Sequence, residues 1–164
     1  MDLRRDILDC IGNTSLVPLR NVAPKNGSRV LLKLESENPT GSMKDRMALA
    51  MIEAAEADGR LAAGGSVVEY TGGSTGVSLS LVCAVRKYPL HIVSSDAFAR
   101  EKLDHMQILG ARLQIVPSVS GGMTGKLTRE MVEAARVIAE RTGAFWTDQL
   151  NNKDQIAAYH KMAE

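Results

Sequence analysis

Hydrophobic positions along the chain follow two alternating patterns. Short apolar runs that are typical of buried strands lie at residues 30–34, 66–70, 90–94, 112–116 and 144–147. Between them, apolar residues recur at helical spacing in longer segments, at residues 43–58, 75–87, 97–109, 123–142 and 152–163. In the first of these segments Met47, Met51 and either Ala54 or Ala55 share one face, and Gly59 is expected to end the helix.

Strands that alternate with helices of ten or more residues predict βαβ units and a parallel sheet. We therefore expect an α/β fold, a three-layer open parallel sheet flanked by helices. Aromatic residues make up only 4% of the chain, so Val, Leu, Ile, Met and Ala must form the core. A chain of 164 residues is long enough to bury such a core.

The composition argues against several classes of partner. The net charge is +1 and no basic stripe is found, so neither nucleic acid nor an anionic membrane is expected to bind. No apolar run approaches ~18 residues, and the N-terminus lacks the apolar core of a signal peptide. Cys10 and Cys83 form no Cys-x-x-Cys pair, which favours a reduced, cytoplasmic setting. The three histidines are not at metal-ligand spacing, so no metal is predicted.

A glycine-rich loop, TGGSTG at residues 71–76, joins the strand at 66–70 to the helix that follows. Glycines allow the backbone to approach a ligand closely, and the free amides of a helix start favour an anion. The hydroxyls of Thr71, Ser74 and Thr75 add donors, so the loop predicts a site for a carboxylate or a phosphate. The alternative is a tight turn that uses glycine for geometry only. Neither the Walker nor the dinucleotide-binding pattern matches the loop.

A second stretch, ENPTGSMKDR at residues 37–46, places a lysine at the start of a helix. With Ser42 as the N-cap, Lys44 falls at the second helical position, where the helix dipole favours the neutral amine. A neutral amine is a nucleophile that can bond to an aldehyde. Asp45 and Arg46 are expected to pair with other charges. On local physics alone, Lys44 can equally be a solvated lysine whose stem reaches away from the dipole.

Taken together, three stretches of the sequence resemble the cysteine synthase family, which comprises pyridoxal-phosphate enzymes of fold type II. They are IGNTSLVPL, KLESENPTGSMKDRMA and TGGSTG, at residues 11–19, 33–48 and 71–76. Further similar segments are SSDAFAREKLDHMQILGARLQIVP, GGMTGK and DQLNN, at residues 94–117, 121–126 and 148–152. The resemblance covers essentially the whole chain, but family members are roughly twice as long, as two domains. It therefore implies the N-terminal half of such an enzyme, without the loop that grips the cofactor phosphate.

The resemblance also implies roles for individual residues. Lys44 would bond to the aldehyde of pyridoxal 5'-phosphate and move the proton on the substrate Cα. The substrate α-carboxylate would be held by the residues Thr71, Gly72, Gly73, Ser74, Thr75 and Gln149. Ser74 would also contact the cofactor. Two departures leave the substrate open, because the serine of the family loop is Gly72 here and its asparagine is Ser74.

The implied reaction is β-replacement on an activated serine, of the O-acetylserine or O-phosphoserine type, to make cysteine or a related β-substituted alanine. One alternative is an amino-acid dehydratase or a diaminopropionate-forming enzyme of the same fold. Another is a catalytically incomplete fragment or paralogue with a structural or partner-binding role. We expect a homodimer in which residues 40–145 form the smaller domain. Residues 1–39 and 146–164 would belong to the larger domain and expose apolar surface.

Overall fold

The computed structural model describes residues 3–21, 27–119 and 121–163. Its centre is a four-stranded sheet with the strand order β5-β4-β3-β6, in which every neighbouring pair is parallel. The strands are β3 (Val67–Tyr70), β4 (Leu90–Ser95), β5 (Arg112–Val116) and β6 (Phe145–Trp146). In register, Val68 lies opposite His91 on one side and Trp146 on the other. The predicted parallel α/β fold is therefore confirmed.

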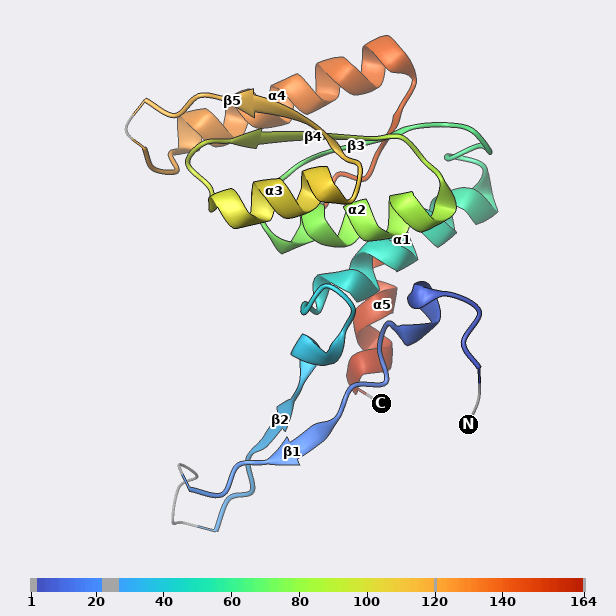
Figure 1. Ribbon diagram of the computed structural model, residues 1–164, viewed down its shortest axis with the longest axis vertical. Helices are drawn as coiled ribbons and strands as arrows, with labels where there is room; N and C mark the ends of the chain where they lie inside the picture. The colour runs from blue at the N-terminus through green and yellow to red at the C-terminus, as the bar shows by residue number, and fades with distance from the viewer. Residues whose placement is uncertain (1–2, 22–26, 120, 164) are drawn as a thin grey trace.

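Helices cover both faces of this sheet (Figure 1). Helices α2 (Ser74–Arg86) and α3 (Arg100–Ile108) lie on one face, and α4 (Gly125–Thr142) lies on the other. Helix α1 (Lys44–Asp58) packs against α2, and α5 (Asp154–Ala163) packs against α1. The described residues thus form the expected three layers, with α1 and α5 added outside α2.

Each face of the sheet buries its own apolar cluster. On the side of α2, the cluster includes Met51, Leu79 and Ile92, none of which is more than 1% exposed. On the side of α4, Met131 packs together with Val68. Burial of each such side chain contributes about 1.5–3 kcal/mol to folding. Cys83 belongs to the first cluster, as its apolar surroundings in the sequence predicted.

The order in which the strands follow one another along the chain creates a topological switch point. From β3 the chain steps to β4 and then β5 through α2 and α3, in one direction along the sheet. Helix α4 then carries the chain back across the opposite face to β6, which pairs on the other side of β3. The direction of winding therefore reverses between β3 and β6. In open α/β sheets, ligands bind at such a switch point, outside the carboxyl ends of the strands.

The N-terminal segment forms a second, smaller sheet that extends away from the first (Figure 1). Its elements are η1 (Ile7–Cys10), β1 (Leu16–Pro18), β2 (Leu31–Lys33) and η2 (Glu35–Glu37), and β1 and β2 pair antiparallel. Strand β1 was not predicted, because three residues give too little periodicity to recognise. Both strands are exposed throughout, with Leu16 56% and Leu32 45% accessible.

The starts of all five α-helices differ from the predicted ones by one to three residues, and three of these differences have a local cause. Met43, not Ser42, is the N-cap of α1, so Lys44 is the first helical residue; the hydroxyl of Ser42 accepts from the Lys44 amide at 3.1 Å. Helix α4 begins at Gly125, because the Thr124 side chain caps it. Helix α3 begins at Arg100 rather than residue 97. The side chain of Ser95 accepts from the Ala97 amide, which holds those residues in a turn.

A buried ion pair fixes the segment that leads into α1. Arg46 donates from Nε and Nη2 to the two carboxylate oxygens of Glu35, both at 2.8 Å, which confirms the charged partner predicted for Arg46. The Thr14 hydroxyl donates to the same carboxylate at 2.6 Å. Asn38 accepts from the Gly12 amide at 2.8 Å. The guanidinium hydrogen bonds lower the pKa of Glu35 to about 2. The first two family-like stretches thus contact each other.

Substitution Glu35→Gln is expected to lower the free energy of unfolding by about 3–5 kcal/mol, because it leaves the buried Arg46 cation unpaired. Chemical denaturation at neutral pH measures this change. The matched control is Asp104→Asn, which breaks the exposed Arg100–Asp104 pair and should leave the midpoint nearly unchanged. Equal losses in the two variants would contradict a stabilising role specific to the buried pair.

Candidate active site

The loop after β3 presents unpaired backbone donors at the carboxyl edge of the sheet. Gly73 is the N-cap of α2 and makes no side-chain cap hydrogen bond. Among the described residues, the amides of Ser74 and Thr75 have no acceptor, since they open the helix. Thr71 is buried, and its hydroxyl accepts from the Gly73 amide at 3.3 Å. The positive end of the α2 dipole and these amides together favour an anion.

The loop after β3, at residues 71–75, is called the donor loop below. The loop after β6 lies beside it. Gln149 donates from Nε2 to the carbonyl of Tyr70 at 2.9 Å, directly before Thr71. The side chain of Gln155 in turn donates to the Gln149 carbonyl at 2.5 Å. The structure thus brings Gln149 to the loop at residues 71–75, although these parts are far apart in the sequence. Both follow strands that flank the switch point.

A buried carboxylate, which the sequence reasoning missed, joins the two loops. Glu69 in β3 is 0% exposed and accepts from the Thr147 hydroxyl at 2.6 Å, the Gln149 amide at 2.9 Å and the Tyr70 amide at 2.8 Å. Burial raises the pKa of Glu69 to about 7, against the opposing effect of these hydrogen bonds. The signal was present in the sequence, because VVEY places one acid in an otherwise apolar strand.

A second buried carboxylate connects the start of α1 to α2. Asp45 is 0% exposed and accepts from the Thr40 amide at 2.8 Å, from the Thr40 hydroxyl, and from the Ser78 hydroxyl at 2.5 Å. Its hydrogen-bond partners in the described part of the chain are therefore neutral, and the prediction of a charged partner for Asp45 is wrong. Because Ser78 lies one turn after Ser74, this network sets the Lys44 end of α1 beside the start of α2.

The amine of Lys44 faces the last helix. Its Nζ lies 5.8 Å from the centroid of the Tyr159 ring in α5, and both side chains are half-buried. In the described residues, the buried hydroxyl of Tyr159 has no hydrogen-bond partner. The link between Lys44 and the donor loop thus runs through Asp45 and Ser78, while the amine occupies the seam between α1 and α5.

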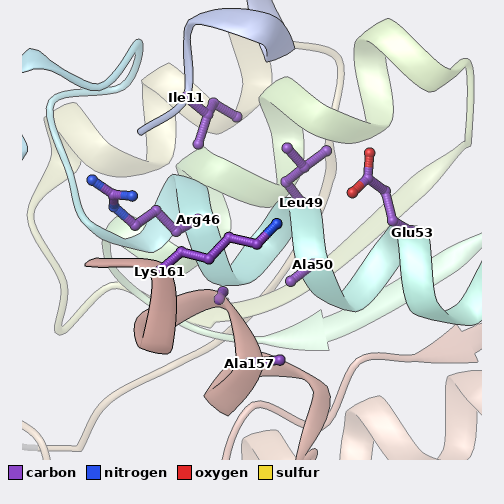
Figure 2. Close-up of a pocket in the computed structure, with 8 residues that line it drawn as sticks. Ile11, Arg46, Leu49, Ala50, Glu53, Ala157 and Lys161 are labelled. Carbon is purple, nitrogen blue, oxygen red and sulfur yellow. The ribbon is translucent and has the colours of Figure 1, made fainter. Parts of the chain in front are cut away.

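A separate cavity of about 220 Å³ lies along the same seam, farther along α1 (Figure 2). Leu49 and Glu53 of α1 line it, together with Ile11, and Lys161 reaches across from α5. Its lining contains neither Lys44 nor any residue of the donor loop. This cavity is therefore distinct from the arrangement at the switch point.

Two further kinds of site were sought in the described ranges 3–21, 27–119 and 121–163. They contain no group of three or more His, Cys, Asp or Glu side chains placed to hold a metal ion. None of their helices is both long enough and apolar enough to cross a membrane.

Comparison with known proteins gives the family. The model of the family described as "Pyridoxal-phosphate dependent enzyme" matches residues 7–164. The chain belongs to this family. It is 38% identical to a cysteine synthase of Staphylococcus aureus over 147 residues, which cover 90% of this chain and 46% of that protein. It is 39% identical to cysteine synthase B of Escherichia coli over 150 residues, covering 92% and 48% respectively.

Solved structures of this pyridoxal-phosphate dependent family superpose closely. An O-ureido-L-serine synthase matches with a TM-score of 0.88 at 34% identity, covering 98% of this chain and 48% of that one. A cysteine synthase from Entamoeba histolytica matches with a TM-score of 0.87 at 34% identity, covering 99% and 48%. The resemblance to the cysteine synthase family and to fold type II is thus confirmed. The chain spans about half the length of the curated relatives it matches.

As pH rises from 5 to 8, Glu69 is expected to lower the free energy of unfolding by about 2 kcal/mol. The folded state binds a proton on Glu69 up to about pH 7, whereas the unfolded carboxylate releases it near its ordinary pKa of 4.5. The stabilisation is therefore complete below about pH 4.5 and lost through pH 7. Denaturation at several pH values should show this slope reduced in Glu69→Gln.

The matched control for this experiment is Glu133→Gln, which alters an exposed carboxylate of α4 that is paired with Arg136. Its slope between pH 5 and pH 8 should equal that of the unmodified protein. An unchanged slope in Glu69→Gln would show that Glu69 is ionised alike in the folded and unfolded states, contrary to the effect of its burial.

Proposed function

We propose that the protein containing this chain replaces the β-substituent of an activated serine, of the O-acetylserine or O-phosphoserine type, and makes cysteine or a related β-substituted alanine. The observation that carries the proposal is the Asp45–Ser78 hydrogen bond, which joins the start of α1, where Lys44 lies, to α2, whose first amides, at Ser74 and Thr75, have no acceptor among the described residues. The names of the relatives, two cysteine synthases and an O-ureido-L-serine synthase, support the same class of reaction.

The residues present fit the reactive end of pyridoxal phosphate. Lys44 supplies an amine for the aldehyde, in a half-buried position where Tyr159 limits contact with water. The half-buried Ser74 supplies a hydroxyl for the ring at the start of α2. When bound, the cofactor would supply an electron sink for the electrons of the substrate Cα–H bond. We assign none of these residues to the cofactor phosphate.

Within this proposal, the chain itself performs two tasks. The amides and hydroxyls at residues 71–75 hold the substrate α-carboxylate. The side chain of Gln149, from the loop after β6, borders the same site. The amine of Lys44, when free, would take the proton from the substrate Cα. A substrate held both at its carboxylate and at the cofactor has its Cα–H bond in a fixed position relative to the base, Lys44.

We also propose how the chain is divided and assembled. Residues 40–145 would form the smaller domain, and residues 1–39 and 146–164 would belong to the larger one. The exposed apolar side chains of β1 and β2 support burial of the hairpin in a homodimer. The cysteines in the described residues are free, with Cys10 exposed and Cys83 buried, which suits a cytoplasmic setting.

Lys44 is expected to be the residue that bonds to the cofactor. The intact protein is mixed with pyridoxal phosphate, reduced with borohydride and digested, and the modified peptide is identified by mass spectrometry. Reduction converts the carbon–nitrogen double bond to a stable amine, so the added mass should lie on the peptide containing Lys44. The visible absorption band and sulfide-dependent release of acetate from O-acetylserine should both disappear in Lys44→Ala.

The matched control is Lys161→Ala, which removes another lysine that faces α1 from α5 (Figure 2). It should keep the band and the modified peptide. Modification of other lysines with Lys44 unmodified would refute the assignment. A modified Lys44 without β-replacement of either O-acetylserine or O-phosphoserine would favour the dehydratase alternative over β-replacement.

The homodimer is expected to depend on the β1–β2 hairpin. The double substitution Leu16→Lys and Leu32→Lys should shift the protein toward the monomer, since charge on this apolar surface disfavours its burial. Sedimentation velocity at micromolar concentration measures the shift. Ile108→Lys, at the end of α3 and 82% exposed, is the control and should leave the dimer intact. A dimer unaffected by the hairpin substitutions would place the interface elsewhere.

A further inference from the structure

Gly72 in the donor loop lies against the aromatic ring of Phe98. A Cβ atom built on Gly72 would lie 1.9 Å from both Cγ and Cδ2 of Phe98, far inside van der Waals contact. At the neighbouring Gly73, a Cβ would meet nothing within 4 Å. The loop therefore excludes a side chain at position 72 because Phe98 fills that space, whereas position 73 is open.

The backbone of the β4–α3 turn holds Phe98 in this place. The Phe98 amide donates to the Ser95 carbonyl at 3.2 Å, and the Ala97 amide donates to the Ser95 hydroxyl at 3.2 Å. Asp96 accepts from the Ser118 amide at 2.7 Å, which ties the turn to the segment after β5. The ring packs against the apolar cluster beneath α4. The position of the ring is thus set by the same turn because of which α3 begins at Arg100 and not at residue 97.

The ring covers Gly72, which precedes by two and three residues the amides of Ser74 and Thr75 that are proposed to hold a carboxylate. Gly72 is buried by the contact, but Phe98 itself is half-exposed, so part of the ring still faces the solvent beside the loop. In the family loop named in the sequence analysis, a serine stands where this chain has Gly72, and its hydroxyl can donate to a ligand. Here a phenyl group from the next loop takes the place of that side chain, and an apolar surface replaces a donor.

We infer that Phe98 is a specificity-determining residue of the substrate site. Its ring stands in for the side chain missing at Gly72 and forms an apolar wall next to the bound α-carboxylate. The wall favours amino acids with an apolar group beside the carboxylate over those with a hydroxyl there, because the hydroxyl would lose water without gaining a partner. The inference rests on the proposed function, in which this loop binds the substrate carboxylate.

The test is a double-mutant cycle on the intact, cofactor-loaded protein, with the variants Gly72→Ser, Phe98→Ala and both together. Gly73→Ser is the matched control on the same loop. The temperature of half-unfolding reports the steric contact, since Gly72→Ser should lower it strongly alone and little when Phe98→Ala is present. Gly73→Ser should cause a much smaller decrease than Gly72→Ser. An equal cost of Gly72→Ser in both backgrounds would overturn the inference.

Binding of L-valine and L-threonine reports selectivity, because the two have the same shape and differ by a methyl group and a hydroxyl. Calorimetry on the unmodified protein should show a preference for L-valine that falls by roughly tenfold in Phe98→Ala. This comparison stands even where Gly72→Ser fails to fold. If both amino acids bind and Phe98→Ala leaves the preference for L-valine unchanged, the role of Phe98 is refuted, whereas the carboxylate-binding function is not. Failure of both amino acids to bind the unmodified protein would instead refute the carboxylate-binding function on which the inference rests.

Discussion

The buried pair between Arg46 and Glu35 is the interaction on which the rest of the site depends. Removing two charges from water is costly, and the bidentate geometry, with the Thr14 hydroxyl as a third donor, offsets that cost. The pair joins the segment before β1, the turn after β2 and the first turn of α1. Lys44 precedes Arg46 by two residues, so this pair, together with the hydrogen bonds of Asp45, holds its backbone in place. In the stretch at residues 37–46, the residues around Lys44 therefore serve mainly to position it.

Three carboxylates, of which Asp45 and Glu69 are buried and Glu35 is partly buried, organise the molecule, and each is accommodated differently. Glu35 is neutralised by a guanidinium, which lowers its pKa to about 2. Asp45 is surrounded by two hydroxyls and an amide. Glu69 faces three neutral donors in a dry position, which raises its pKa to about 7. The first supports the start of α1, the second joins α1 to α2, and the third joins the loops after β3 and β6. Together they connect every predicted site segment.

Local pattern was enough to predict most elements, the parallel sheet and the three layers, because periodicity and glycine stops are local properties. The resemblance to the cysteine synthase family suggested Lys44, the loop at 71–76 and Gln149 as one site. The structure brings the loop and Gln149 together, while their roles stay predictions. What could not be predicted depends on tertiary contact. No sequence rule pairs Gly72 with Phe98, or Glu69 with Thr147. The late start of α3 likewise follows from the Ser95 turn, which competes with helix formation.

The return of the chain from β5 to β6 has a consequence for folding order. Strands β3, β4 and β5 pair with near neighbours in sequence, whereas β6 reaches β3 only after α4 has crossed the opposite face. Closing that long loop costs more chain entropy than the earlier pairings. Until it closes, Glu69 lacks two of its three donors and Gln149 is distant from Tyr70. We therefore expect the loops after β3 and β6 to meet only when β6 pairs, and a nascent chain that ends before β6 would hold only the loop after β3.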